Sequence, residues 1–188
     1  MIHLLSFDIG IKNMAYCFAD VLYDDNNNKK IIVNNLNKID LNISKKSNTQ
    51  NIIDNTIEFL DITFNELNIN NNFKLIVLIE CQMTSIMKCI QNVINTYFKV
   101  ISKYEGLNIE TSYLSPKHKL NIINKYEDKL VSSSYKQNKL DAIYFTKYLL
   151  ENVYTFDNIL NIFLNTKKKD DLSDAFLMII YYFENIIK

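Results

Sequence analysis

The chain has 188 residues, of which 48% are hydrophobic and 22% charged, and its formal net charge is zero. This composition predicts one globular domain that is long enough to bury a core. The mean hydropathy is −0.09, and no apolar run reaches the roughly 18–20 residues that a membrane-spanning helix needs, so we expect no membrane contact.

The cysteines and the first residues indicate an intracellular protein. Cys17, Cys81 and Cys89 form no C-x-x-C pair, which argues against a disulfide framework or a zinc site and favours a reducing compartment. The first residues also lack the basic and then apolar segments of a secretory signal.

All 21 positively charged residues are lysines. Lysine is a point charge and lacks the planar fork with which arginine recognises guanine and phosphate. Sequence-specific base recognition is therefore not expected. Because the net charge is zero, a nucleic-acid surface would need lysines that cluster locally.

The first half of the chain predicts three strands, a helix and a central strand. Apolar or alternating segments at residues 2–7, 14–22 and 30–36 are separated by short turns, which favours an antiparallel meander. Apolar residues then recur with helical spacing over residues 48–67. The unbroken apolar segment at 73–79 is typical of a central strand.

The second half predicts three helices and one more strand. Apolar residues spaced for one helix face run from residue 83 to residue 104, and a strand is expected at 107–114. A basic loop or short helix at 117–129 precedes helices at about 136–152 and 170–187. We expect residues 1–188 to form a single α/β domain with a five-stranded mixed sheet.

A single carboxylate, Asp8, directly follows the first apolar segment and precedes Gly10, one of only two glycines in the chain. Burying a lone carboxylate beside a sheet core is costly unless a positive charge meets it, so Asp8 either helps to hold a cation or pairs with a lysine. Gly10 is expected at a position with positive φ or a close backbone approach. Gly106 is expected in an ordinary turn.

Further acids follow the fourth expected strand and begin the last expected helix. If the first and fourth strands are neighbours, Asp8 and Glu80 project from the same sheet edge, where ligands usually bind in α/β sheets. Asp171 and Asp174 are spaced to share one helix face, where they repel each other and Asp170. A helix N-terminus offsets roughly 0.3–1 kcal/mol per charge, and a divalent cation offsets far more. Four oxygen donors suit Mg²⁺ or Mn²⁺, and two such ions about 3.5–4 Å apart can support phosphodiester cleavage.

Lysines flank these acids. The triplet Lys167-Lys168-Lys169 directly precedes the acidic turn, and the lysines that follow the fifth expected strand include Lys117, Lys119, Lys136 and Lys139. Positive charge around an acidic metal site indicates that a phosphate polymer crosses it.

Each of these residues, taken alone, also has a structural explanation. Asp8 and Glu80 are consistent with solvated turn acids, the aspartates of the last helix with capping, and the lysine triplet with a solvated face. His3 and His118 have no partner at a metal-ligand spacing. The joint order of strand-end Asp, strand-end Glu and D-x-x-D at a helix start indicates the metal site.

The same residues carry a resemblance to a known family. The motifs are Asp8-Ile9-Gly10-x-Lys12-Asn13, Glu80-x-Gln82, Ser134-Tyr135-Lys136-x-x-Lys139 and Lys169-Asp170-Asp171-x-x-Asp174-x-Phe176. In them the chain resembles the poxvirus Holliday junction resolvases, of the RuvC-type branch of the RNase H-like superfamily. The resemblance implies an RNase H-like fold, with helices on both faces of the five-stranded mixed sheet.

The resemblance also implies a set of site residues. Four carboxylates, Asp8, Glu80, Asp171 and Asp174, would hold two Mg²⁺ ions, with Mn²⁺ able to substitute, and no small-molecule cofactor is implied. Lys139 would be the active-site lysine, with Lys136 and Lys119 as alternatives. The expected DNA-binding lysines are Lys12, Lys119, Lys136, Lys167, Lys168 and Lys169. The family also has arginines around its active-site lysine and before the last motif, whereas this chain has only lysines there.

The implied activity is a structure-selective endonuclease that resolves four-way (Holliday) and other branched DNA junctions by paired symmetric nicks. Because a four-way junction has two-fold symmetry, we expect a homodimer, with the helix at 83–104 as its candidate seam. A viral protein of this kind would act in the cytoplasm of the host cell.

Three alternatives stay open. A nucleotide-binding protein of the actin and sugar-kinase class also opens with a strand carrying D-x-G, but it needs glycine-rich phosphate loops, and this chain has two glycines. A catalytically inactive junction-binding protein could share the fold, although all five site residues are present. A generic ribonuclease H, which cleaves RNA in a hybrid, has no helix start of this D-x-x-D kind.

Overall fold

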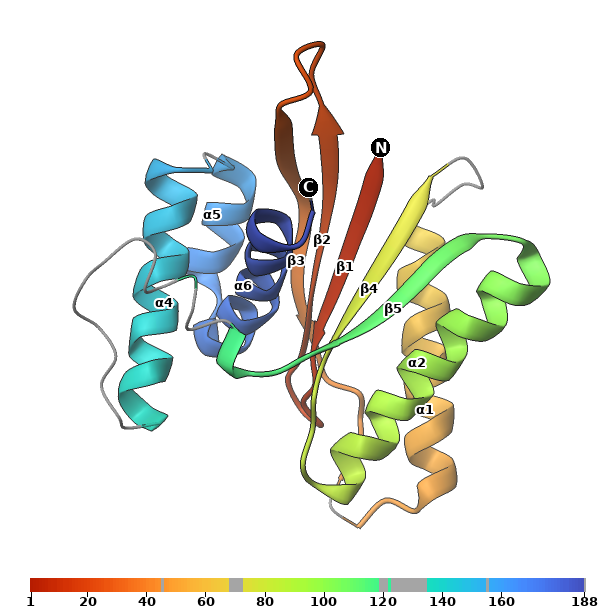
Figure 1. Ribbon diagram of the computed structural model, residues 1–188. Coiled ribbons are helices and arrows are strands. Elements are labelled where there is room, and N and C mark those ends of the chain that lie inside the picture. The colour runs from red at the N-terminus through yellow and green to blue at the C-terminus, as the bar shows by residue number, and fades with distance from the viewer. Residues whose placement is uncertain (45, 68–72, 119–121, 123–134, 155, 188) are drawn as a thin grey trace.

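The strands form one five-stranded sheet with the spatial order β3-β2-β1-β4-β5 (Figure 1). The computed structural model describes residues 1–44, 46–67, 73–118, 122, 135–154 and 156–187. The strands are β1 (Ile2–Asp8), β2 (Met14–Tyr23), β3 (Lys29–Ile39), β4 (Lys74–Glu80) and β5 (Asn108–Leu114).

The sheet is mixed, as predicted. β1 pairs antiparallel with β2, and β2 with β3, which confirms the meander. The pairs β1–β4 and β4–β5 are parallel. Strands β1, β4 and β5 therefore end at the same edge of the sheet.

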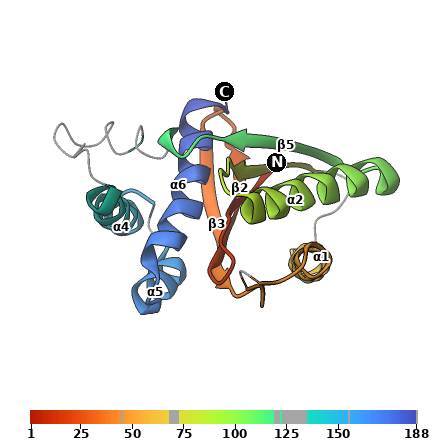
Figure 2. The same ribbon diagram turned by 90° about the horizontal axis from the view of Figure 1, so that it is seen from below.

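Helices cover both faces of the sheet (Figures 1 and 2). On one face lie α1 (Thr49–Glu66) and α2 (Ser85–Glu105), and on the other lie α4 (Tyr135–Asn152), α5 (Asp157–Asn165) and α6 (Lys169–Asn185). Helix α6 packs on β1 and β2, and α4 packs on α6. Within the described residues, no helix combines the length and the apolar content needed to cross a membrane.

Helix α5 is missing from the elements expected above. It has nine residues, of which Ile159 and Phe163 are buried, and a helix of little more than two turns is too short to be recognised by its apolar spacing alone. The basic segment expected at 117–129 lies largely outside the described residues.

Strand β1 contributes to two cores, because successive side chains of a strand point to opposite faces. Leu4 belongs to the core under α6, whereas Leu5 and Phe7 belong to the core under α1 and α2. All three side chains are fully buried. The strand that ends in Asp8 is therefore shielded from water on both faces.

Helix α6 is fixed near both of its ends. The buried Ser6 hydroxyl donates to the carbonyl oxygen of Ala175 at 2.7 Å. At the other end, Lys29 Nζ donates to the carbonyl oxygens of Phe183 at 2.6 Å and Ile187 at 2.5 Å. A cation at a helix C-terminus also interacts favourably with the helix dipole. These contacts tie α6 to β1 and to the start of β3.

His3 has a structural partner across the first strand pair. Its Nδ1 lies 2.5 Å from Oδ1 of Asp20, the residue opposite it on β2. Asn34 donates to the other oxygen of Asp20 at 2.7 Å. Burial alone raises the pKa of Asp20, but the hydrogen bonds from His3 and Asn34 outweigh burial, and the pKa lies below its usual value.

One of the two glycines has a backbone role expected of it, and the other does not. A Cβ atom at Gly10 would lie 2.6 Å from the carbonyl oxygen of Asn13, so the close approach is confirmed. The positive φ, 69°, belongs to Gly106, which ends α2 in the left-handed conformation. The expectation of an ordinary turn at Gly106 is wrong, because the residue caps a long helix.

Candidate metal centre at the sheet edge

Two acidic side chains end neighbouring parallel strands. Asp8 is the last residue of β1 and Glu80 the last residue of β4. The two strands pair in register up to Phe7 and Ile79, so the acids follow the last paired residues. Each acid is only 8% exposed, and both carboxylates are therefore largely removed from water.

Helix α6 adds a third carboxylate at this edge. Asp174 directly precedes Ala175, whose carbonyl oxygen accepts the hydrogen bond from Ser6 of β1. One carboxylate oxygen each from Asp8, Glu80 and Asp174 lies within 4.8 Å of the other two. The three acids, far apart in the sequence, are brought together by the parallel strand pair and by the anchored helix.

Asp171 is not part of this group of three. It is half-buried, and its Oδ2 is buried without a hydrogen-bond partner among the described residues. Burial and the neighbouring charge of Asp170 raise the pKa of Asp171. A buried carboxylate oxygen that lacks a donor is costly, and a cation near it would remove that cost.

Lys139, the predicted active-site lysine, lies on α4 and reaches the first turn of α6. Its Nζ donates to Oδ2 of Asp170 at 2.6 Å. Burial alone raises the pKa of Asp170, but the hydrogen bond and charge of Lys139 outweigh it and lower that pKa. The ammonium group of Lys139 thus lies beside the acidic turn of α6, four residues before Asp174, and joins α4 to it.

A chain of two glutamines supports Glu80. The side-chain amide of Gln82 donates to Oε2 of Glu80 at 3.0 Å. The backbone N–H of Gln82 donates in turn to Oε1 of Gln91 on α2, at 2.7 Å. Gln82 belongs to a motif quoted above, but Gln91 is absent from the expected site residues. Its only signal in the sequence is a polar residue at an inner, partly buried position of α2.

The predicted DNA-binding lysines are described only in part. Lys12 is exposed in the loop after Asp8, and Lys167 and Lys168 are exposed directly before α6. Lys169 is half-buried, and its Nζ donates to the carbonyl oxygen of Thr166 at 2.7 Å. Lys119 and the side chain of Lys136 lie outside the described residues.

The donor set fits a hard divalent cation. Carboxylate oxygens make up the group of three, without histidine or cysteine, and such ligands suit Mg²⁺ or Mn²⁺ better than zinc or copper. Mg²⁺ keeps several waters and needs few protein ligands, so three acids suffice. The buried oxygen of Asp171 lies one turn from Asp174 but outside the group of three.

Comparisons with known proteins agree with this architecture. The family model described as "Mitochondrial resolvase Ydc2 / RNA splicing MRS1" matches residues 4–84, a segment that includes Asp8 and Glu80. The crystal structure of the yeast mitochondrial Holliday junction resolvase Ydc2 is similar with a TM-score of 0.67 and 17% identity, over 95% of this chain and 76% of that one. No curated protein sequence matches the chain significantly.

Two structures of RuvC from Thermus thermophilus are more distant. RuvC by itself has a TM-score of 0.46 and 12% identity, over 96% of this chain and 95% of that one. RuvC in complex with a Holliday junction substrate has a TM-score of 0.45 and 12% identity, over 97% and 94%.

The chain has the RNase H-like fold that was predicted. The five-stranded mixed sheet, its strand order and the helices on both faces establish the fold, together with the similarity to Ydc2. The narrower resemblance to the poxvirus enzymes stays a prediction.

Proposed function

We propose that the chain is a divalent-metal-dependent endodeoxyribonuclease that resolves four-way and other branched DNA junctions. The observation that carries the proposal is the convergence of oxygens from Asp8, Glu80 and Asp174 within 4.8 Å. The family match over residues 4–84 and the similarity to the yeast resolvase support the choice of substrate.

In this proposal Asp8, Glu80, Asp171 and Asp174 hold two Mg²⁺ ions, which Mn²⁺ can replace. Bound there, the ions would activate a water and stabilise the leaving oxygen of the phosphodiester. The chain's own contribution is to fix the oxygens, since two acids end paired strands and a third lies on a helix that Ser6 anchors.

Lysines would then position the DNA. Lys139, already beside the acidic turn through Asp170, is proposed to balance charge near the scissile phosphate. The exposed Lys12 follows Asp8 in the sequence, and the exposed Lys167 and Lys168 precede the aspartates of α6. Lys169, Lys119 and Lys136 are further candidates. Without arginine, these contacts favour recognition of the backbone and branch geometry over base sequence.

Paired symmetric nicks require two active sites, so the proposed enzyme is a homodimer. The two sites of a two-fold dimer match the two-fold symmetry of a four-way junction. The proposal keeps the expectation of a reducing intracellular compartment, which for a viral protein is the host cytoplasm.

The test compares nicking of a synthetic four-way junction with nicking of a linear duplex of the same sequence. We expect Mg²⁺-dependent cleavage of the junction and little of the duplex. Asp25→Asn, in the exposed β2–β3 turn, is a matched control that should keep full activity. Equal cutting of both DNAs, or none with Mg²⁺ present, would reject the proposal.

The variant Asp174→Asn distinguishes the proposed nuclease from an inactive junction-binding protein. If the wild type cuts and this variant binds junctions without cutting, the binding-only function is excluded. An RNA–DNA hybrid in the same assay tests the ribonuclease H alternative, and ATP binding tests the kinase-like one.

A further inference from the structure

A lysine that is not among the expected site residues lies in the same row of the sheet as Asp8. Asp8 pairs with Ala15 of β2, and Ala15 pairs with Lys38 of β3. The start of β2 and the end of β3 therefore lie at the edge where β1 ends (Figure 1). Adjacent strands are about 4.8 Å apart, so the Cα atoms of Asp8 and Lys38 are separated by about 10 Å.

The side chain of Lys38 also lies on the same face of the sheet as that of Asp8. Side chains two residues apart along a strand point to one face. Leu36, two residues before Lys38, belongs to the core under α6. Ser6, two residues before Asp8, donates its hydroxyl hydrogen bond to α6. Lys38 therefore extends from the sheet on the side that carries Asp174.

The ammonium group of Lys38 is held by the loop after Asp8. Its Nζ donates to Oδ1 of Asn13 at 3.0 Å, and the side chain is half-buried. Among the residues that the structure describes, no carboxylate forms an ion pair with this Nζ. The neutral amide oxygen of Asn13 orients the ammonium group without cancelling its charge, which stays available to an anion.

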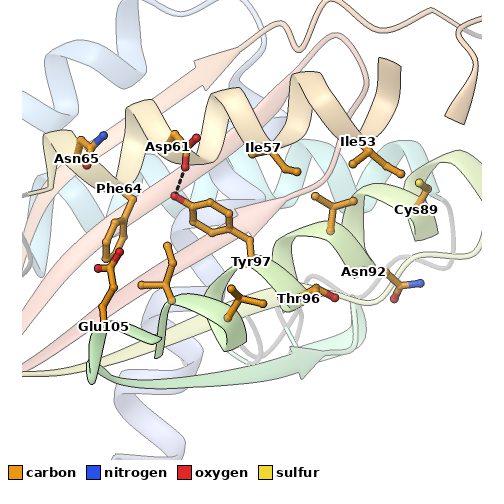
Figure 3. Close-up of a pocket in the computed structure, with 13 residues that line it drawn as sticks. Ile53, Ile57, Asp61, Phe64, Asn65, Cys89, Asn92, Thr96, Tyr97 and Glu105 are labelled. Atoms are coloured by element: carbon orange, nitrogen blue, oxygen red, sulfur yellow. Dashed lines mark hydrogen bonds between the residues drawn. The ribbon is translucent and has the colours of Figure 1, made fainter. Parts of the chain in front are cut away.

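The groove between α1 and α2 lies on the other face of the sheet (Figure 2) and does not suit a DNA strand. It has a volume of about 640 Å³ and apolar walls that include Ile57 and Phe64 (Figure 3). The charged residues that line it within the described chain are two acids, Asp61 and Glu105, and no lysine. Asp61 accepts a hydrogen bond from the Tyr97 hydroxyl at 2.6 Å. Because DNA needs positive partners for its phosphates, we expect the strand on the α6 face.

We propose that Lys38 binds a backbone phosphate of the DNA strand that crosses the metal centre, and that Asn13 positions its ammonium group. Phosphates of one strand recur about every 3.4 Å along a duplex. A group about 10 Å from Asp8 therefore meets a phosphate about two or three nucleotides from the scissile one. A phosphate contact positions the DNA without reading its bases. The inference rests on the proposed function and extends the DNA contacts of that site towards β3.

The salt dependence of junction binding tests this contact. Each phosphate that a protein neutralises adds about −0.9 to the slope of log Kobs against the logarithm of the salt concentration. Lys38→Met removes the charge and keeps most of the side chain, whereas Lys38→Arg keeps the charge. Lys30→Met is the matched control, because Lys30 is an exposed lysine at the other end of the same strand. Binding is measured in EDTA, which prevents cutting, and circular dichroism checks folding.

We expect Lys38→Met to make the slope shallower by about 0.9. The affinity advantage of the wild type over this variant should then shrink about 3.5-fold between about 50 and 200 mM salt. Lys38→Arg and Lys30→Met should keep the wild-type slope. A Lys38→Met protein with the wild-type slope, or an equal loss in Lys30→Met, would overturn the inference.

Single methylphosphonate substitutions in the junction locate the phosphate. A methylphosphonate carries no charge, and it is introduced at one position at a time along a strand that passes through the branch point. We expect one position at which the substitution weakens binding of the wild type but not of Lys38→Met. If both proteins lose affinity in parallel at every position, Lys38 has no phosphate partner and the inference is wrong.

The nicking assay separates this inference from the proposed function. A wild type that binds junctions without cutting them, together with a shallower slope for Lys38→Met, contradicts only the nuclease. A wild type that cuts junctions, together with an unchanged slope for Lys38→Met, contradicts only the contact of Lys38. A wild type that binds no junction contradicts both.

Discussion

The three clustered carboxylates predict an unusual response to Asp174→Asn. At 4.8 Å, the upper limit of the separations among the three oxygens, and an effective dielectric constant of about 20, each pair of charges repels by about 3.5 kcal/mol. Asp174 belongs to two of the three pairs, so the neutral amide removes up to about 7 kcal/mol of repulsion. The net gain is smaller because each acid also makes a further contact. We expect the metal-free variant to be about 1–2 kcal/mol more stable than the wild type.

Thermal unfolding in EDTA measures the stability of the metal-free protein, and unfolding in Mn²⁺ measures the stability gained from the metal. A gain of 1 kcal/mol corresponds to a rise of about 2–4 °C in Tm for a chain of this size. For the wild type, Mn²⁺ at about 100 times its Kd should add about 2.7 kcal/mol. The variant should gain much less from Mn²⁺, because it lacks one of the ligands.

Asp25→Asn serves as the control, since it removes an exposed acid distant from the cluster in the sequence. It should leave both the metal-free stability and the response to Mn²⁺ unchanged. An Asp174→Asn protein that is less stable than the wild type in EDTA and keeps the full gain from Mn²⁺ would refute the metal centre.

Two further substitutions test the surroundings of the site, and a third tests the pair of His3 and Asp20. Ser6→Ala removes the buried hydrogen bond to α6, and urea unfolding should show a loss of about 1 kcal/mol together with weaker Mn²⁺ binding. Gln91→Ala should weaken Mn²⁺ binding, measured by calorimetric titration, by about tenfold, because Gln82 loses the acceptor that orients it towards Glu80. Asp20→Asn should cost about 1 kcal/mol at neutral pH. Because the folded state lowers the pKa of Asp20, its ionised form adds stability above its unfolded pKa of about 4, and the difference from wild type should shrink below that value and be lost as the pH falls through the lower folded pKa.

For each of these three substitutions, one result would contradict the prediction. Metal binding unaffected by Ser6→Ala would mean that the anchor does not position Asp174. Gln91→Glu keeps an acceptor oxygen and should bind Mn²⁺ more tightly than Gln91→Ala; equal weakening would remove the glutamine chain from the site. A stability difference at Asp20 that is the same at pH 3 and pH 7 would show that its charge is irrelevant.

Local patterns were sufficient to predict the strand-end acids. An unbroken apolar segment that ends in an acid defines both the strand and its carboxyl end, as at Asp8 and Glu80. Once two such strands are parallel neighbours, their last residues must meet at one edge. That is why the sheet and the two strand-end acids followed from local patterns, whereas Asp174 was predicted from the D-x-x-D spacing and the family resemblance.

The arrangement of the last helix was not accessible in the same way. The side chains of the α6 aspartates point in different directions around the helix axis. Only the packing of α6 decides which of Asp170, Asp171 and Asp174 faces the strand ends. The contact between Lys139 and Asp170 joins residues of two helices that are 31 positions apart in the sequence, which no local pattern encodes. Gln91 is a similar case, because a polar residue on a helix is ordinarily solvated.

The two attachments of α6 bear on which ions the centre accepts. A helix held by β1 near its first turns and by Lys29 at its far end has little freedom to swing outwards. Ca²⁺ needs ligands at about 2.3–2.6 Å and more of them, whereas Mg²⁺ needs about 2.0–2.1 Å. The fixed position of α6 would then favour Mg²⁺ over Ca²⁺, because the larger ion of equal charge would require the carboxylates to move apart.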